Sequence, residues 1–119
     1  MATYVDGFVI PIPRKNLAAY KKMALGGRKV WMKHGALQYF ECMADDLKAM
    51  PGCGDFKKMV KLKPGETLWY SFVIYKSRAH RDAVNKKVMK EMQSFKMPKV
   101  MPFDMKRMAH GGFRVVVQG

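Results

Sequence analysis

Three acidic residues, Asp6, Glu41 and Asp104, are the strongest candidates for chemistry in this sequence. Acids are scarce, with nine Asp and Glu against 23 Lys and Arg. Asp6 and Glu41 fall inside segments predicted to be strands, where Asp is disfavoured and a buried carboxylate needs a partner. We hypothesise a cleft in which these acids meet a phenol, a guanidinium and an imidazole. The candidate ligand-binding residues are Asp6, His34, Glu41, Tyr70, Asp104 and Arg107.

Structural pairing is the favoured alternative for the same acids, because ion-pair networks perturb titratable groups much as active sites do. In that interpretation Asp104 pairs with Arg107, and Asp6 pairs with a lysine. A further alternative is that Asp6 and Glu41 face solvent, or satisfy a β-bulge at Gly7.

The three histidines, His34, His80 and His110, lie far apart and each has a structural interpretation. His34 ends a predicted helix, where a cation interacts favourably with the helix dipole. His80 is expected to be an exposed helix residue, and His110 to lie in a turn before two glycines. The standard nucleophile, phosphate-loop, dinucleotide and zinc-protease motifs are absent from the sequence. We therefore expect no metal and no cofactor, and the sequence does not decide whether the protein is an enzyme.

Cys42 and Cys53 have no histidine near them, which excludes zinc-ligand spacing. Cys42 is expected to be a buried apolar residue of a strand. Because no signal peptide is apparent, we expect a cytoplasmic protein with reduced thiols, and a Cys42–Cys53 disulfide is the open alternative. The 12 methionines are scattered, which suits filling of the core and of a dimer interface better than metal or flavin binding.

The sequence patterns predict elements in the order β-α-β-β-β-α-β. Alternating or β-branched runs predict strands over 4–12, 36–44, 56–62, 67–75 and 113–117, and apolar periodicity predicts helices over 15–34 and 78–92. The 63–66 turn, with Pro64 and Gly65 at its centre, is typical of type II and predicts a hairpin between 56–62 and 67–75. Ser77 is expected to cap the second helix.

In the first helix one face is predicted to be apolar, and the basic side chains, Lys21 and Arg28 among them, mostly cover the rest. Gly26 and Gly27 interrupt this helix and indicate either a kink or a close contact with another element. Gly7 in the first strand likewise indicates a bulge or a close backbone approach.

This arrangement predicts a single α+β domain over residues 1–119, with a ferredoxin-like antiparallel sheet and two helices on one face. The strand 67–75 is apolar on both faces, so its second face also needs cover. We expect a second copy of the sheet to supply it, which predicts a homodimer.

Three segments, 4–9, 41–46 and 101–113, together resemble the YbaA-like family of small bacterial proteins, in the dimeric α+β-barrel superfamily. The third segment, MPFDMKRMAHGGF, is the most specific. The resemblance covers nearly the whole chain and implies a ferredoxin-like subunit whose sheet packs on that of a partner. It implies no established reaction. Met43 and Met105 stand where the family usually has Trp and Gly.

The formal net charge of +14 attracts anions in general, and like-charge repulsion also keeps a protein soluble. The expected function is binding of a small ligand, anionic ligands included, between sheet and helices, with Trp31, Tyr39 and Tyr70 lining the pocket. The alternative is an RNA-binding or other nucleic-acid-binding module that uses the basic surface. We do not favour it, because no RNA-recognition signature is present and the sheet face is needed for the dimer. No apolar run is long enough for a membrane span, and no membrane partner is expected.

Overall fold

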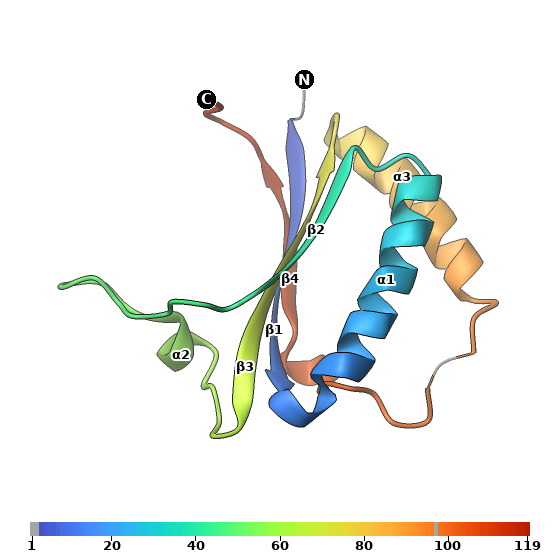
Figure 1. The fold of residues 1–119 in the computed structure, drawn as a ribbon. Coiled ribbons are helices and arrows are strands. Elements are labelled where there is room, and N and C mark those ends of the chain that lie inside the picture. The colour runs from blue at the N-terminus through green and yellow to red at the C-terminus, as the bar shows by residue number, and fades with distance from the viewer. Residues whose placement is uncertain (1–2, 97) are drawn as a thin grey trace.

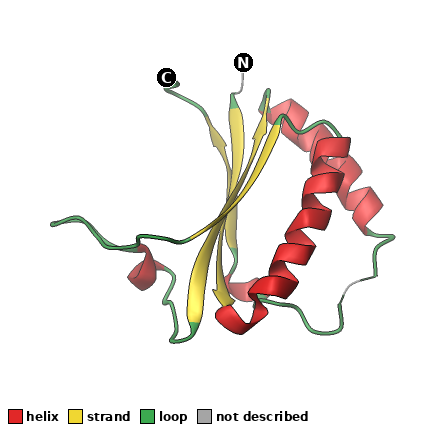
Figure 2. Cartoon of the chain, in the orientation of Figure 1, coloured by secondary structure: helices red, strands yellow, loops and turns green. Residues whose placement is uncertain are grey.

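The computed structural model describes residues 3–96 and 98–119, and its centre is a four-stranded antiparallel sheet. The strand order is β2-β3-β1-β4. The helices α1 and α3 lie together on one face of this sheet, and in the described part of the chain only the short helix α2 lies on the side of the other face (Figures 1 and 2). The strands are β1 (Tyr4–Pro13), β2 (Gln38–Met43), β3 (Glu66–Tyr75) and β4 (Ala109–Arg114). The α-helices are α1 (Leu17–Lys33), α2 (Phe56–Met59) and α3 (Arg78–Met92). Two short 3-10 helices, η1 (Arg14–Asn16) and η2 (Met105–Arg107), precede α1 and β4. The fold is of the ferredoxin-like α+β class predicted from the sequence.

The core lies between the sheet and the two long helices. Ile12, Val73 and Tyr75 on the strands and Val88 on α3 are almost completely buried. Burial of one such apolar side chain contributes about 1.5–3 kcal/mol relative to leaving it exposed. This packing holds α1 and α3 at fixed positions over the sheet, and so positions every polar side chain between them.

Several local predictions are confirmed. Helix α3 has the predicted bounds, and the Ser77 side chain accepts a hydrogen bond from the backbone N–H of His80 at 3.0 Å. Gly65 has φ +80°, the positive value that a type II turn requires at its third residue. Helix α1 ends at Lys33, next to His34.

The predicted strand 56–62 and its hairpin with 67–75 are wrong. Residues Phe56–Met59 form the short helix α2, because Asp55 caps it by accepting a hydrogen bond from the backbone N–H of Lys58 at 2.7 Å. Both edges of β3 are paired, one with β1 and one with β2, which leaves no edge for a further strand.

The last strand is Ala109–Arg114, earlier than the predicted 113–117. Its pairing with β1 ends at Arg114 opposite Tyr4, where β1 itself begins. Val116 and Val117 therefore run past the sheet and are exposed. The bulge at Gly7 is also absent, since the register of β1 with both neighbours continues residue by residue.

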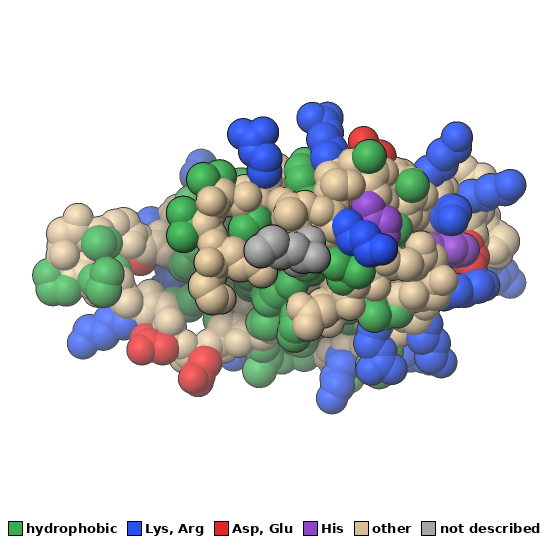
Figure 3. Space-filling view, turned by 90° about the horizontal axis from the view of Figure 1, so that it is seen from above, with side chains coloured by type: hydrophobic (Ala, Val, Ile, Leu, Met, Phe, Trp, Pro, Cys, Tyr) green, Lys and Arg blue, Asp and Glu red, His purple; other side chains and the backbone are tan. Residues whose placement is uncertain are grey.

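Charge is distributed unequally over the surface. Lys and Arg side chains project from the helix side, whereas apolar side chains are exposed at the end of the segment that links β2 to β3 (Figure 3). None of the helices among residues 3–96 and 98–119 is both long and apolar enough to cross a membrane.

Candidate functional site

The six predicted site residues do not form one cleft. Asp6 and Glu41 both point toward the helices, but β3 lies between their strands. Tyr70 lies on the opposite face of the sheet, where it contacts Phe72 with ring centroids 5.6 Å apart. Each of the other residues has separate partners, so the predicted convergence of Asp6, Glu41, Tyr70, Arg107 and His34 is not observed.

Asp6 is buried beneath α3 in an ion pair. Its Oδ1 lies 3.5 Å from an Arg81 guanidinium nitrogen, and its Oδ2 accepts a hydrogen bond from Asn85 Nδ2 at 3.3 Å. Arg81 also donates to the Tyr4 hydroxyl at 3.0 Å. Gly112 of β4 is needed here, because a Cβ would collide with that hydroxyl and lie 2.9 Å from Arg81. The partner of Asp6 is therefore an arginine rather than the predicted lysine.

Arg107 pairs with Glu66 at the start of β3 rather than with Asp104. Its other guanidinium nitrogen donates to the carbonyls of Val60 and Lys61, at 3.4 and 3.0 Å. Burial alone would raise the pKa of the Glu66 carboxyl, but the hydrogen bond from Arg107 and the cations nearby lower it on balance. Asp104 caps η2 by accepting from the backbone N–H of Lys106 at 3.0 Å. Both predicted residues thus hold the chain before β4 in place.

His34 has the structural role expected at a helix end. Its Nε2 lies 2.9 Å from Glu91 of α3, which Lys33 also contacts at 2.8 Å. The hydrogen bonds from Lys33 and then from His34 lower the pKa of the Glu91 carboxyl. This partly buried cluster ties the C-terminal end of α1 to α3.

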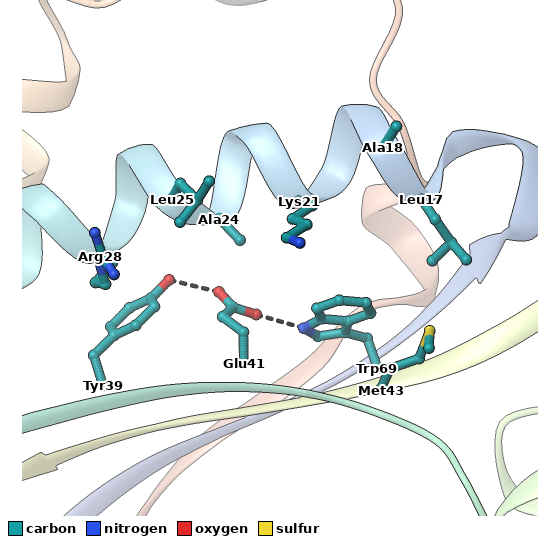
Figure 4. Close-up of a pocket in the computed structure, with 10 residues that line it drawn as sticks. All are labelled: Leu17, Ala18, Lys21, Ala24, Leu25, Arg28, Tyr39, Glu41, Met43 and Trp69. Atoms are coloured by element: carbon teal, nitrogen blue, oxygen red, sulfur yellow. Dashed lines mark hydrogen bonds between the residues drawn. The ribbon is translucent and has the colours of Figure 1, made fainter.

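Glu41 differs from the other acids because its partners are neutral donors. Its Oε1 accepts hydrogen bonds from the Tyr20 hydroxyl at 3.0 Å, from Trp69 Nε1 at 2.6 Å and from the Ser71 hydroxyl. Its Oε2 accepts from the Tyr39 hydroxyl at 2.6 Å (Figure 4). A carboxylate oxygen has about two lone pairs, so Oε1 is fully used whereas Oε2 can accept a further hydrogen bond.

The two phenols at Glu41 remain protonated donors at neutral pH. Burial raises the pKa of Tyr20 above its ordinary 10.0, and the negative charge of Glu41 raises it further. Burial also raises the pKa of Tyr39, followed by the hydrogen bond to Glu41. The carboxylate is thus solvated by the protein itself.

A cavity of about 510 Å³ lies beside Glu41, between α1 and the β2 edge of the sheet (Figure 4). Its lining residues are Leu17, Ala18, Lys21, Ala24, Leu25, Arg28, Tyr39, Glu41, Met43 and Trp69. The walls are mainly apolar, and Lys21 and Arg28 add two positive charges from α1. In the described part of the chain neither cation lies within 4.0 Å of a carboxylate.

Gly27 allows α1 to approach β2 at this cavity. A Cβ on Gly27 would lie 2.9 Å from the Tyr39 hydroxyl oxygen, whereas a Cβ on Gly26 would meet nothing within 4 Å. Of the two alternatives for the glycine pair, a kink or a close contact, the structure shows a close contact, and it occurs at the second glycine. Tyr39 lines the cavity as predicted, but Trp31 instead donates to Tyr75 and Asn85 in the core.

The sequence reasoning missed Lys21, Arg28 and Trp69 as site residues. A usable signal was present, because positions 17, 21, 24 and 28 lie on one row of a helix. Trp69 and Ser71 also alternate onto the same face of β3. Cys42 was expected to be buried, but its side of β2 has no helix layer and it is exposed. No group of three or more His, Cys, Asp or Glu within residues 3–96 and 98–119 could hold a metal ion.

Known proteins resemble this chain over nearly its full length. Residues 3–105 match the family model described as a protein of unknown function, DUF1428. The uncharacterized protein YbaA of Escherichia coli K12 is 37% identical over 114 residues, covering 96% of this chain and 97% of its own, and YbaA of Shigella flexneri matches equally. A crystal structure of a dimeric ferredoxin-like protein from an uncultured marine organism superposes with a TM-score of 0.63 at 10% identity, covering 100% of both chains. The chain thus has a ferredoxin-like fold, is related to YbaA and belongs to the DUF1428 family.

Proposed function

We propose that this protein binds a small molecule with an apolar body and one anionic group, in the cavity between α1 and β2. The observation that carries the proposal is the combination of Glu41, held by four neutral donors, with two cations, Lys21 and Arg28, that have no carboxylate partner among the described residues. The cavity volume of about 510 Å³ falls in the range of about 300–1,000 Å³ typical of small-molecule sites.

Each part of the cavity supports one feature of the ligand. Leu17, Leu25 and Met43 offer apolar contact to its body. Lys21 and Arg28 suit a carboxylate or phosphate, because charge-assisted hydrogen bonds to such groups are about twice as strong as neutral ones. The free acceptor capacity of Glu41 Oε2 suits a hydroxyl or amide donor on the ligand.

Calorimetric titration with paired probes tests this proposal. The probes are apolar carboxylates from propionate to decanoate and 4-phenylbutyrate, each beside its neutral amide. The best carboxylate should bind more tightly than its amide, and Lys21→Met or Arg28→Met should weaken it about 5- to 10-fold. Lys22→Met and Lys29→Met, on the same helix but outside the cavity, are the matched controls. Equal affinity for acids and amides throughout the panel would contradict the proposal.

We also infer that two copies associate through the sheet face opposite the helices. By strand alternation this face carries Val5, Gly7, Val9, Pro11, Gln38, Phe40, Cys42, Leu68, Tyr70, Phe72, Ile74, Ala109, Gly111 and Phe113, which we call the open face. None of these residues is charged. Phe40 stacks on Phe72 at 4.7 Å between ring centroids, and Phe113 is 64% exposed. An apolar partner suits this surface better than a nucleic acid, whose phosphates need cations that the open face lacks.

The surface area of the chain supports the same inference. It exposes 8795 Å², about 2,200 Å² more than a compact monomer of this mass exposes. An excess of this size is what one partner contributes to a large dimer interface, since obligate interfaces bury about 2,000–5,000 Å² in total. The dimeric neighbour of the same fold is consistent with it.

We further propose a cytoplasmic location. Cys42 and Cys53 are both free and exposed, which suits a reducing compartment. Two thiols per chain, trapped by rapid acid quench of whole cells and then counted in the unfolded protein, would support this location, and a Cys42–Cys53 disulfide would contradict it.

A further inference from the structure

The segment 44–65, which links β2 to β3 and which we call the arm, contributes no side chain to the buried core. None of its residues is buried, although it contains apolar side chains throughout. Met50 is 71% exposed and Met59 67%, and Phe56 is also exposed. A monomer gains nothing from presenting these side chains to water, because exposed apolar clusters mark interaction sites.

The arm is nevertheless held firmly at both ends. Ala44 donates its backbone N–H to the Leu68 carbonyl at 2.8 Å, which continues the β2–β3 pairing by one residue. At the other end Arg107 donates to the carbonyls of Val60 and Lys61, and Lys61 has the uncommon positive φ of 52°. Next to the second anchor, the backbone N–H of Leu62 donates to the Lys57 carbonyl at 2.9 Å, which closes the chain around α2. The direction of the arm is thus set by the subunit itself.

That direction is away from the helices and past the open face (Figure 1). A small apolar cavity of about 120 Å³ lies between the arm residues Leu47 and Phe56 and the sheet residues Leu68 and Tyr70. Leu47 and Phe56 of the arm therefore continue the uncharged surface of the open face. Any protein that packs against the open face also meets the arm.

We propose that the arm is an inter-subunit clasp, in which Met50, Phe56 and Met59 of one copy pack against the second copy. This inference rests on the association proposed above and goes beyond it by naming a segment outside the sheet as part of the interface. A two-fold axis makes the contact reciprocal, so each arm reaches past its own sheet toward the other subunit. The extended shape agrees with this, since the radius of gyration is 15.4 Å whereas a compact chain of this length has about 13.5 Å.

Sedimentation equilibrium of the full chain tests the clasp. Met50→Ser/Met59→Ser removes two side chains that are already exposed in the subunit, so folding should be unaffected. The dimer dissociation constant should rise at least 10-fold. Met32→Ser/Met89→Ser, at exposed methionines of α1 and α3, is the matched control and should leave the constant unchanged. Circular dichroism verifies that each variant is folded.

A third variant, Phe113→Asp, separates failure of the clasp from failure of the dimer. If the wild type is dimeric and Phe113→Asp dissociates it, but the arm variant keeps the wild-type constant, the clasp is overturned and the sheet interface stands. If the wild type is a monomer at 100-micromolar concentration, both inferences are overturned. Dissociation of the dimer by the arm variant as well as by Phe113→Asp, with the methionine control still dimeric, supports the clasp.

Discussion

Asp6 and Glu41 lie on the same face of one sheet, yet they are held in opposite ways. Asp6 has a cation beside it, the guanidinium of Arg81, whereas Glu41 is surrounded by hydroxyl and indole donors. Asp6 lies at the centre of the sheet under α3, and Glu41 lies on the edge strand next to a cavity. The two carboxylates therefore serve as an internal comparison between a structural acid and a candidate ligand-binding acid.

The difference lies in where the compensating charge is. The Asp6 charge is neutralised inside the fold, so a ligand has nothing to add there. At Glu41 the nearby cations, Lys21 and Arg28, are beyond ion-pair distance and face the cavity. A carboxylate solvated by neutral dipoles, with cations held apart from it, leaves both signs of charge available to a bound molecule.

The largest expected effect comes from replacing each acid by its amide. Asp6→Asn removes the buried carboxylate partner of Arg81 and leaves it only the exposed Asp82, at 3.1 Å, which should lower the free energy of unfolding by about 3 kcal/mol. Glu41→Gln keeps an acceptor oxygen and strands no cation, so it should cost only about 1 kcal/mol. Urea unfolding measures both.

Probe binding should rank the two variants in the reverse order. Glu41→Gln removes a negative charge beside the cavity and should raise the affinity for the best apolar carboxylate. Asp6→Asn should leave this affinity at the wild-type value wherever the protein is folded. Equal losses of stability, or equal changes of affinity, would mean that the two acids do the same work.

Glycine substitutions test the same comparison with smaller effects. Gly112→Ala forces the Tyr4 hydroxyl and Arg81 away from their positions at Asp6 and should cost about 2 kcal/mol. Gly27→Ala displaces the Tyr39 hydroxyl, but a helical alanine recovers up to about 1 kcal/mol, so its net cost should be near zero while probe affinity falls.

Gly26→Ala is the control for this pair, because it gains the helix propensity and meets no atom within 4 Å. It should raise the midpoint of thermal unfolding and leave probe affinity unchanged. If Gly26→Ala and Gly27→Ala behaved alike, the close contact between α1 and Tyr39 would have no role in the site.

The helices and most strands could be predicted because their signals are local. The apolar periodicity of 78–92 and the cap at Ser77 lie within the segment that they specify. The strand predicted over 56–62 was wrong because the local signals there favour a helix. Phe56, Met59 and Val60 have helical spacing, and Asp55 caps one helical turn. A strand at this position would also find no free edge of the sheet to pair with.

The site was predictable only in part, since it depends on strand order. Alternation alone places Asp6 and Glu41 on strands, but only the order β2-β3-β1 separates them by two strand spacings, about 10 Å. Arg81 and Lys21 become partners or neighbours of these acids through the packing of α3 and α1, which no spacing in the sequence encodes. Because the sequence has few acids, Glu41 could be identified as a candidate, but the residues that surround it could not be predicted.

The buried tyrosines should have the smallest effect on stability at neutral pH, because they change the free energy of unfolding only at alkaline pH. The pKa values of Tyr20 and Tyr39 at Glu41, and of Tyr75 near Asp6, are all raised, with burial as the largest cause. These phenols ionise near pH 10 in the unfolded chain and only at higher pH in the folded one. The folded state therefore binds more protons above pH 10, and stability must fall as pH rises from there.

Each such phenol contributes a slope that grows above pH 10 toward a limit of about 1.4 kcal/mol per pH unit. Tyr39→Phe should remove one such contribution between pH 10 and 11, and its unfolding free energy at pH 7 supplies the baseline. The measurement is urea unfolding at intervals of half a pH unit. If Tyr39→Phe kept the wild-type slope, Tyr39 of the wild type would ionise at the same pH in the folded and the unfolded chain. Its phenolate would then lie 2.6 Å from the Glu41 carboxylate, which is possible only if water screens the pair. In that case Glu41 would be an ordinary wet surface acid, and its contrast with Asp6 would be one of exposure rather than of chemistry.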